Sequence, residues 1–182
     1  MEMKYLIIIL FPFLYSLAFS QSHTKEELVY IREVNILRAN PQAYLAYVID
    51  DAKNDSVLMK IVETELVPLM DTLSPLPLLE VSNTVRQSLE KFDGKIDSAS
   101  LWVYHGDFKW VDFNYVTLSE NLTAGSNVRK SIILALIDVT TKTRGHRKAL
   151  LNRDKNFTAV RKVTLGKGIN SRVWWINEIA KL

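Results

Sequence analysis

The sequence of 182 residues contains no cysteine. This absence excludes disulfide bonds, thiolate metal sites, a cysteine nucleophile and a lipid-modified cysteine. Stability must therefore come from packing and polar contacts, and any bound metal must use imidazole, carboxylate or carbonyl ligands. Histidine is also scarce, with three residues in the chain, so few imidazole groups are available for catalysis or metal binding.

Runs of one charge are missing as well. The formal net charge is +3, and the basic residues are scattered along the chain rather than grouped. A nucleic-acid-binding surface usually needs such a group, so we expect no nucleic-acid partner. The chain has no internal repeat and no low-complexity segment, and its length is that of one domain.

One long apolar run is present, near the N-terminus. Lys4 precedes the run YLIIILFPFLYSLAF, and Ala18 and Ser20 supply the small residues of a cleavage site. The run has about 15 residues and contains Pro12, whereas a membrane-spanning helix needs about 20. We therefore expect a signal peptide over residues 1–20, a secreted protein without a stable membrane span after cleavage, and a single domain over residues 21–182. An uncleaved anchor is the alternative.

Two helices are predicted at the start of this domain. Thr24 and Glu27 have the spacing of a capping box, and the Asn-Pro pair at 40–41 is typical of a second helix start. Asn35 and Arg38 fall in line with apolar positions of the first helix, which suggests that they form inward hydrogen bonds. The alternative is an ordinary helix end with polar residues.

The middle of the chain is irregular. Ser56 is expected to cap a short helix, and the prolines from Pro68 to Pro77 predict an extended connection after it. Residues 79–92 resume helical spacing. At the C-terminus, FTAVRKVTL and RVWWINEIAKL surround a glycine-containing turn and predict an antiparallel hairpin.

The segment from 119 to 152 carries the functional hypothesis. Its apolar positions from 128 to 139 have helical spacing and predict one core helix. Ser126 or Asn127 would cap this helix, and the chain is expected to leave it near Arg144. Glu120 stands in a polar turn before the helix, and His146 stands in a Gly-His-Arg turn after it.

A third residue completes a possible site. His105, fifteen residues before Glu120, follows a short extended segment at 101–104. Should the chain fold back at both ends of the core helix, these two residues and His146 would form a His/Glu/His cluster in a surface cleft. Such a set can bind Zn²⁺ or a similar divalent ion with one open coordination position, or polarise a water for hydrolysis. The spacing is not that of an HExxH motif.

Each of these residues also has a structural interpretation. Glu120 can accept backbone N–H groups in its turn, His146 can contact a carbonyl at a helix end, and His105 can be an exposed loop residue. Ser119 invites a nucleophile interpretation, but no GxSxG elbow surrounds it and the sequence places no base beside it. Arg147 can pair with any carboxylate.

Taken together, several segments resemble the CAP superfamily in its cysteine-free microbial form. This superfamily is the domain of cysteine-rich secretory proteins, antigen 5 and plant pathogenesis-related proteins. The matching segments are NILRANP with Asn35 and Arg38, LPLLEVSNTV, the isolated His105, SENLTAG with Glu120, and GHRKALLN with His146 and Arg147.

The resemblance implies an α+β fold, namely an α-β-α sandwich with a small antiparallel sheet between helix layers. It also implies a cleft that binds a divalent metal in some members. The matching cleft residues are His105, Glu120 and His146, with Ser119, Asn121, Arg147, Asn35 and Arg38 as supporting residues. The second glutamate of the animal members has no counterpart in the matching segments.

Most members of the family act as binders, so the resemblance favours a secreted, non-catalytic binding module. It would bind an unidentified small molecule, a lipid or an extracellular partner. A metal-assisted peptidase or esterase that uses the same cleft is the alternative. A surface protein with a purely structural role is a third interpretation.

Overall fold

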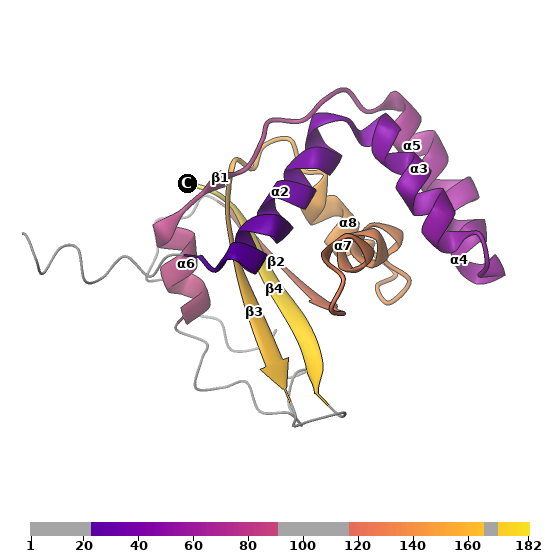
Figure 1. Cartoon of the computed structure of the whole chain (residues 1–182). Coiled ribbons are helices and arrows are strands. Elements are labelled where there is room, and N and C mark those ends of the chain that lie inside the picture. The colour runs from indigo at the N-terminus through magenta and orange to yellow at the C-terminus, as the bar shows by residue number, and fades with distance from the viewer. Residues whose placement is uncertain (1–22, 91–116, 166–170) are drawn as a thin grey trace, which may run out of the picture.

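The computed structural model describes residues 23–90, 117–165 and 171–182 (Figure 1). In chain order the elements are α2 (Lys25–Ala39), α3 (Pro41–Ala52), α4 (Ser56–Ile61), the π-helical turn η1 (Val62–Leu66), α5 (Val67–Thr72), β1 (Glu80–Val81), α6 (Asn83–Glu90), β2 (Thr117–Ala124), α7 (Val128–Ile137), α8 (Gly145–Leu150), β3 (Phe157–Leu165) and β4 (Arg172–Lys181). The expected signal peptide and His105 lie outside these residues.

The four strands form one sheet in the order β1-β3-β4-β2. The C-terminal hairpin is confirmed, because β3 and β4 pair antiparallel from Phe157 opposite Ala180 to Leu165 opposite Arg172. β2 pairs antiparallel with the other side of β4. The short strand β1 pairs parallel with β3, so the sheet is mixed, with an antiparallel set of three long strands.

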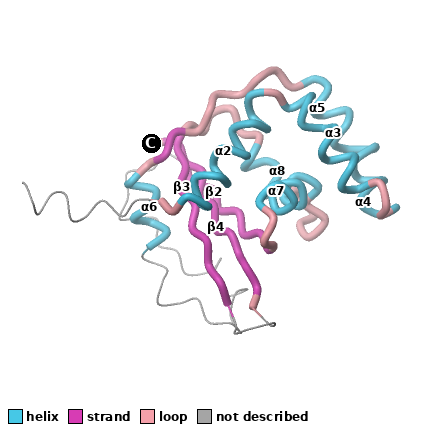
Figure 2. The backbone as a smooth tube through the Cα atoms, viewed as in Figure 1, coloured by secondary structure: helices cyan, strands magenta, loops and turns pink. Residues whose placement is uncertain are grey.

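The two faces of the sheet are covered by different helices (Figure 2). On β4, Trp175 and Ile179 belong to the larger core with α2, α3 and α7. Ile176 and Ala180 point to the other face and pack with residues of α6. This alternation is the two-residue period of a strand that is buried on both faces. The α+β class and the sandwich arrangement are therefore confirmed. Helices α3, α4 and α5 lie further out, beyond α2 and α7 (Figure 1).

The start of α2 follows the sequence prediction. Thr24 accepts a hydrogen bond from the backbone of Glu27, and the Glu27 carboxylate accepts one from the backbone of Thr24. The amide of Asn35 exchanges two hydrogen bonds with the backbone of Leu79, at 3.0 and 2.8 Å. The inward orientation expected for Asn35 is confirmed.

Arg38 is fully buried and collects four backbone carbonyls. Its guanidinium donates to Pro77 at 2.8 Å, Leu150 at 2.8 Å, Asn152 at 3.0 Å and Lys155 at 3.0 Å. A planar guanidinium with five N–H donors can serve several carbonyls at once. It thereby ties α2 to the proline connection and to the segment between α8 and β3.

The core helix near residue 128 is shorter than predicted. Asn127 caps it, as expected, but α7 ends at Ile137 and Asp138 adopts a left-handed conformation with φ 52°. Val139, assigned to the buried stripe, is 43% exposed. A second helix, α8, begins at Gly145, so His146 lies at the N-terminus of α8 rather than in a turn after one long helix.

The proline connection also differs from the prediction. Asp55 rather than Ser56 caps α4. The helical segment continues through η1 into α5, and Pro68 lies at the second position of α5, directly after the π-helical turn. The extended connection begins at Leu73. Residues 80–81, expected to be helical, form β1 because they pair with β3.

None of the helices in the described ranges is long and apolar enough to cross a membrane.

Replacing Arg38 should destabilise the fold more than replacing an exposed arginine of the same helix. We expect Arg38→Lys to lower the free energy of unfolding by about 2–4 kcal/mol. One ammonium cannot donate to all four carbonyls, and those that it cannot reach stay buried without a partner. Urea unfolding at pH 7 would measure the difference, with Arg32→Lys as the control. Equal losses in the two variants would contradict this role for Arg38.

Candidate functional site

His146 lies beside a buried carboxylate that the sequence analysis did not identify. Its Nδ1 is 2.9 Å from Oδ1 of Asp138, and its backbone N–H donates to Oδ2 at 2.9 Å. The hydroxyl of Thr141 donates to Oδ1 at 2.8 Å. The Asp138 side chain is 0% exposed, whereas the His146 side chain is 19% exposed. A buried acid therefore holds one side of a partly exposed imidazole.

The backbone around this acid is unusual. Asp138 and Arg144 both have positive φ, at 52° and 54°, a conformation that costs about 1 kcal/mol or more for a residue with a side chain. Hydrogen bonds offset this cost, since the Arg144 guanidinium donates to the Asp138 carbonyl at 2.6 Å. The Asp138 carboxylate also accepts the backbone N–H groups of His146 and Arg147 in the first turn of α8, where a negative charge is favoured.

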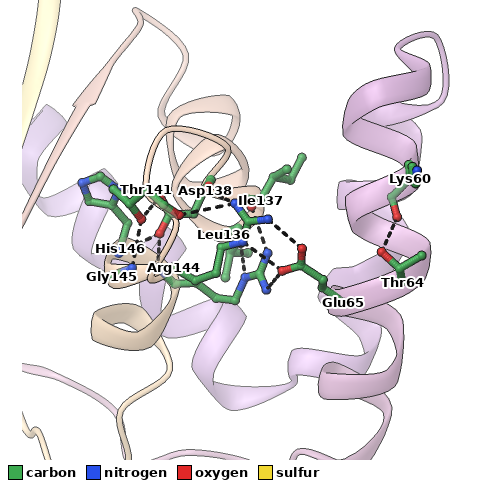
Figure 3. A network of polar contacts seen from close by, with 11 residues as sticks. Lys60, Thr64, Glu65, Leu136, Ile137, Asp138, Thr141, Arg144, Gly145 and His146 are labelled. Carbon is green, nitrogen blue, oxygen red and sulfur yellow. Dashed lines mark hydrogen bonds and ion pairs between the residues drawn. The ribbon is translucent and has the colours of Figure 1, made fainter.

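Two arginines join this corner to the outer helices through Glu65 of η1 (Figure 3). Arg144 donates two hydrogen bonds to the Glu65 carboxylate, at 2.9 and 2.6 Å, and Arg147 donates one at 2.8 Å. Arg147 also donates to the carbonyls of Leu136 and Ile137 at the end of α7. The carboxylate pairing expected for Arg147 is thus present, with Glu65 as its partner.

The electrostatics keep both acids of the network ionised. The hydrogen bond from Arg144 lowers the pKa of Glu65 to about 2, and Arg147 adds to this effect. Burial alone would raise the pKa of Asp138, but the hydrogen bonds from His146 and Thr141 outweigh it, so the pKa falls below its ordinary value. A carboxyl group whose pKa is lowered in the folded state stabilises the fold fully when the pH is above its ordinary pKa. This stabilisation is lost as the pH falls through the lowered pKa.

The arrangement fixes what His146 can do. An ionised Asp138 next to Nδ1 favours the tautomer that carries its proton there, so Nε2 of the neutral ring is an acceptor. In Figure 3 the imidazole stands at the end of the network remote from Glu65. Its outer nitrogen can therefore accept a hydrogen bond or a proton, or bind a metal ion.

Glu120 lies in a different environment from the one expected. It belongs to β2 rather than to a turn, and it pairs across the sheet with Glu178. Its neighbours Leu118 and Leu122 pack in the smaller core under α6, so Glu120 shares that face. α8 packs through Leu150 in the larger core, on the other face.

The structure thus gives His146 another carboxylate, Asp138, and places Glu120 on the α6 face of the sheet. Within the described ranges, no three His, Asp or Glu side chains are grouped as metal ligands. The proposed His/Glu/His cluster also needs His105, which lies outside those ranges, so the cluster stays a prediction.

Glu178 is a buried acid that the sequence analysis missed. It is 1% exposed, Oε1 accepts a hydrogen bond from Ser88 at 3.2 Å, and Oε2 is buried without a partner. Burial raises the pKa of Glu178 to about 8, and the facing charge of Glu120 contributes in the same direction. At neutral pH the side chain is therefore mostly a neutral carboxylic acid.

Ser119 and Asn121 project from the opposite face of β2. The ammonium nitrogen of Lys155 is hydrogen-bonded to the Ser119 hydroxyl and to the carbonyl of Ile179. Asn121 is fully buried, and both polar atoms of its side chain lack a partner. Asn177, directly across from it on β4, has an unpartnered Oδ1. Buried polar groups of this kind usually require a water or a ligand.

The signals for these missed residues differ. Glu178 lies between Ile176 and Ala180 on the same buried face of β4, so the two-residue period of that strand could have identified it. Lys155 precedes β3 and carries no such signal. Asp138 could not be found, because its role depends on the unexpected end of α7.

A shallow hollow of about 190 Å³ lies elsewhere, between α3 and the start of α7. Its charged side chains are already paired, since Arg129 contacts Glu33 at 2.5 Å and Lys130 contacts Asp51 at 3.6 Å. Arg129 also lies over the ring of Tyr47, 4.2 Å from its centroid. This hollow therefore presents compensated charges rather than a site for one charged ligand.

Comparison with known proteins gives a structural likeness. No family model matches the sequence, and no curated protein matches it. Among solved structures, an outer surface protein from Borrelia burgdorferi is similar, with 18% sequence identity, a TM-score of 0.41, and coverage of 69% of this chain and 93% of that chain.

The buried acid of β4 predicts a pH-dependent stability. Because the pKa of Glu178 is raised to about 8, its contribution is full below the ordinary carboxyl pKa and is lost as the pH rises toward 8. Between pH 5 and pH 8 the wild type should lose on the order of 2 kcal/mol of unfolding free energy that Glu178→Gln does not lose. This value is discounted from about 1.4 kcal/mol per pKa unit, because buried sites relax.

Urea unfolding of the wild type and of Glu178→Gln at both pH values would measure this difference. Glu80→Gln, at an exposed position of β1, serves as the control. If the wild type and Glu178→Gln lost stability equally between pH 5 and pH 8, the neutral state assigned to Glu178 would be wrong.

Proposed function

We propose that this chain is an exported binding module of the CAP type and that His146 is its recognition group. The observation that carries the proposal is the contact between the buried Asp138 carboxylate and Nδ1 of a partly exposed imidazole. A ring held in this way has a fixed orientation and a fixed acceptor, Nε2, before any ligand arrives. Such preorganisation lowers the entropic cost of binding.

The network around His146 supports binding more than turnover. The hydroxyl of Thr141 donates to Asp138 and accepts from the backbone of Gly145. Arg144 and Arg147 are engaged with Glu65 and with backbone carbonyls. These groups hold the acid and the helix ends in place. The imidazole of His146 is partly exposed and contacts the network through Nδ1, so its Nε2 is the group that would contact a ligand.

The metal-assisted hydrolase is the alternative function. It requires His105 and Glu120 to join His146 around one ion, with Zn²⁺ as the expected ion. Three protein ligands would leave one position for a water that the metal makes acidic. The position of Glu120 on the α6 face argues for the binding interpretation, since His146 already has a carboxylate partner of its own.

Zn²⁺ is a suitable probe of a preoriented imidazole. We expect wild-type protein to bind Zn²⁺ in calorimetric titrations, His146→Ala to bind at least about 10-fold more weakly, and Asp138→Asn to lose about 10- to 100-fold through the altered orientation of the ring. His23→Ala is the matched control, because His23 precedes α2 and its Nε2 already accepts a hydrogen bond from the backbone N–H of Val160. Equal heats for wild type and His146→Ala would contradict a recognition role for His146.

The same titrations separate the two functions. If His105→Ala and Glu120→Gln weaken binding as much as His146→Ala does, the three-ligand metal site of the hydrolase is supported. If only His146→Ala and Asp138→Asn weaken it, the imidazole acts with Asp138 alone, as the binding module requires.

A further inference from the structure

The amine of Lys155 is enclosed without a counter-charge. The residue is 3% exposed, and its Nζ is hydrogen-bonded to the Ser119 hydroxyl and, at 3.1 Å, to the Ile179 carbonyl. No carboxylate pairs with it in the described part of the chain. A buried ammonium whose partners are a hydroxyl and a carbonyl is poorly compensated, because both partners supply only partial charges.

This environment favours the neutral amine. Burial lowers the pKa of Lys155 to about 8, so a sizeable fraction is unprotonated slightly above neutral pH. When Nζ is charged it donates to Oγ of Ser119, and when it is neutral it can accept the hydroxyl proton across the same contact. The pair therefore has the geometry of a nucleophile and its general base.

Ser119 is placed where a substrate can reach it. Its side chain is half-buried, and it lies near the start of β2, which is an edge strand among the described strands. Asn121 projects from the same face two residues further along, about 7 Å away at strand spacing. Its side-chain amide is fully buried and both of its polar atoms lack a protein partner, so an unsatisfied polar group lies beside the Ser119–Lys155 pair.

We propose that Ser119 is a nucleophile activated by Lys155, and that the chain hydrolyses small acyl esters through an acyl-Ser119 intermediate. This site is separate from the His146 corner, and it involves neither a metal nor Glu120. The half-buried position of Ser119 limits the acyl group to a small one.

The reaction balances with water as the second substrate. Oγ of Ser119 bonds to the ester carbonyl carbon while its proton passes to neutral Nζ of Lys155. The carbon–oxygen bond to the alcohol then breaks, and the ammonium returns the proton to the departing alcohol. A water next attacks the acyl carbon and gives a proton to Nζ. The bond between the acyl carbon and Oγ of Ser119 then breaks, Oγ takes the proton back from the ammonium, and a carboxylic acid is released.

A fluorophosphonate provides the direct test, because it forms a stable adduct with activated serines. We expect one adduct on the folded wild type, located at Ser119 by peptide mapping and absent in Ser119→Ala. Labelling should slow about 100-fold or more in Lys155→Met, the range of a lost general base. Lys148→Met, at an exposed position of α8, is the control for the loss of a positive charge and should label like the wild type.

Two further measurements keep the test decisive if Lys155→Met fails to fold. The labelling rate of the wild type should rise with pH with a midpoint near 8, following the free amine. Lys155→Arg keeps a cation at the position but cannot act as a base, and should label as slowly as Lys155→Met. Turnover of p-nitrophenyl acetate should fall to the buffer background in Ser119→Ala.

Several results would overturn the proposal. They are the absence of an adduct on Ser119, an equal labelling rate in folded Lys155→Met or Lys155→Arg, and a labelling rate that is flat between pH 6 and pH 9. None of them bears on Zn²⁺ binding by His146, so failure here and failure of the proposed binding function can be distinguished.

Discussion

The guanidinium of Arg38 fixes the part of the chain on which both candidate sites depend. It holds the carbonyls of Leu150 and Lys155, and so sets the end of α8 and the approach to β3. At the other end, Asp138 accepts the backbone N–H groups of His146 and Arg147 in the first turn of α8. α8 is therefore held at both termini by buried ionised groups. His146 stands at one end of this short helix, and Lys155 stands five residues beyond the other.

A chain without cysteine needs other long-range cross-links, and arginine supplies them here. Arg38 reaches Leu150 across 112 positions of sequence, and Arg147 reaches Glu65 across 82. Hydrogen bonds to a charged group contribute about 1.5–3 kcal/mol each, and more is lost when one buried partner is removed. Unlike a disulfide, such a link stabilises the folded state through desolvated contacts, so it depends on the packing around it.

The sequence was most informative where local chemistry decides the structure. The capping box at Thr24, the cap at Asn127 and the C-terminal hairpin follow from side-chain preferences that act over a few residues. The inward direction of Asn35 and Arg38 followed from helical period. The left-handed turn at Asp138 could not be predicted, because tertiary hydrogen bonds from Arg144 and His146 stabilise a conformation that local preferences disfavour.

The position of Glu120 illustrates a different difficulty. In a strand, a shift of one residue moves a side chain to the other face, so the face occupied by Glu120 depends on its register against β4. That register pairs it with Glu178 and leaves Ser119 on the side of Lys155. Ser119 and Glu120 are adjacent in sequence, but their side chains therefore lie on opposite faces of the sheet.

Two buried ionisable groups, Glu178 on β4 and Lys155 next to it, have strongly shifted pKa values. Glu178 lies under α6 and Lys155 lies at the opposite face, and burial shifts the pKa of each to about 8, from below and from above. Glu178 costs stability as the pH rises toward 8, whereas Lys155 restores it as the pH rises from 8 toward its ordinary value. Their combined contribution is thus lowest near pH 8, where each group is about half protonated. A fold selected for stability alone would bury apolar residues at these positions. The poorly compensated amine of Lys155 contacts the Ser119 hydroxyl, and the proposed chemistry at Ser119 accounts for its burial better than packing does.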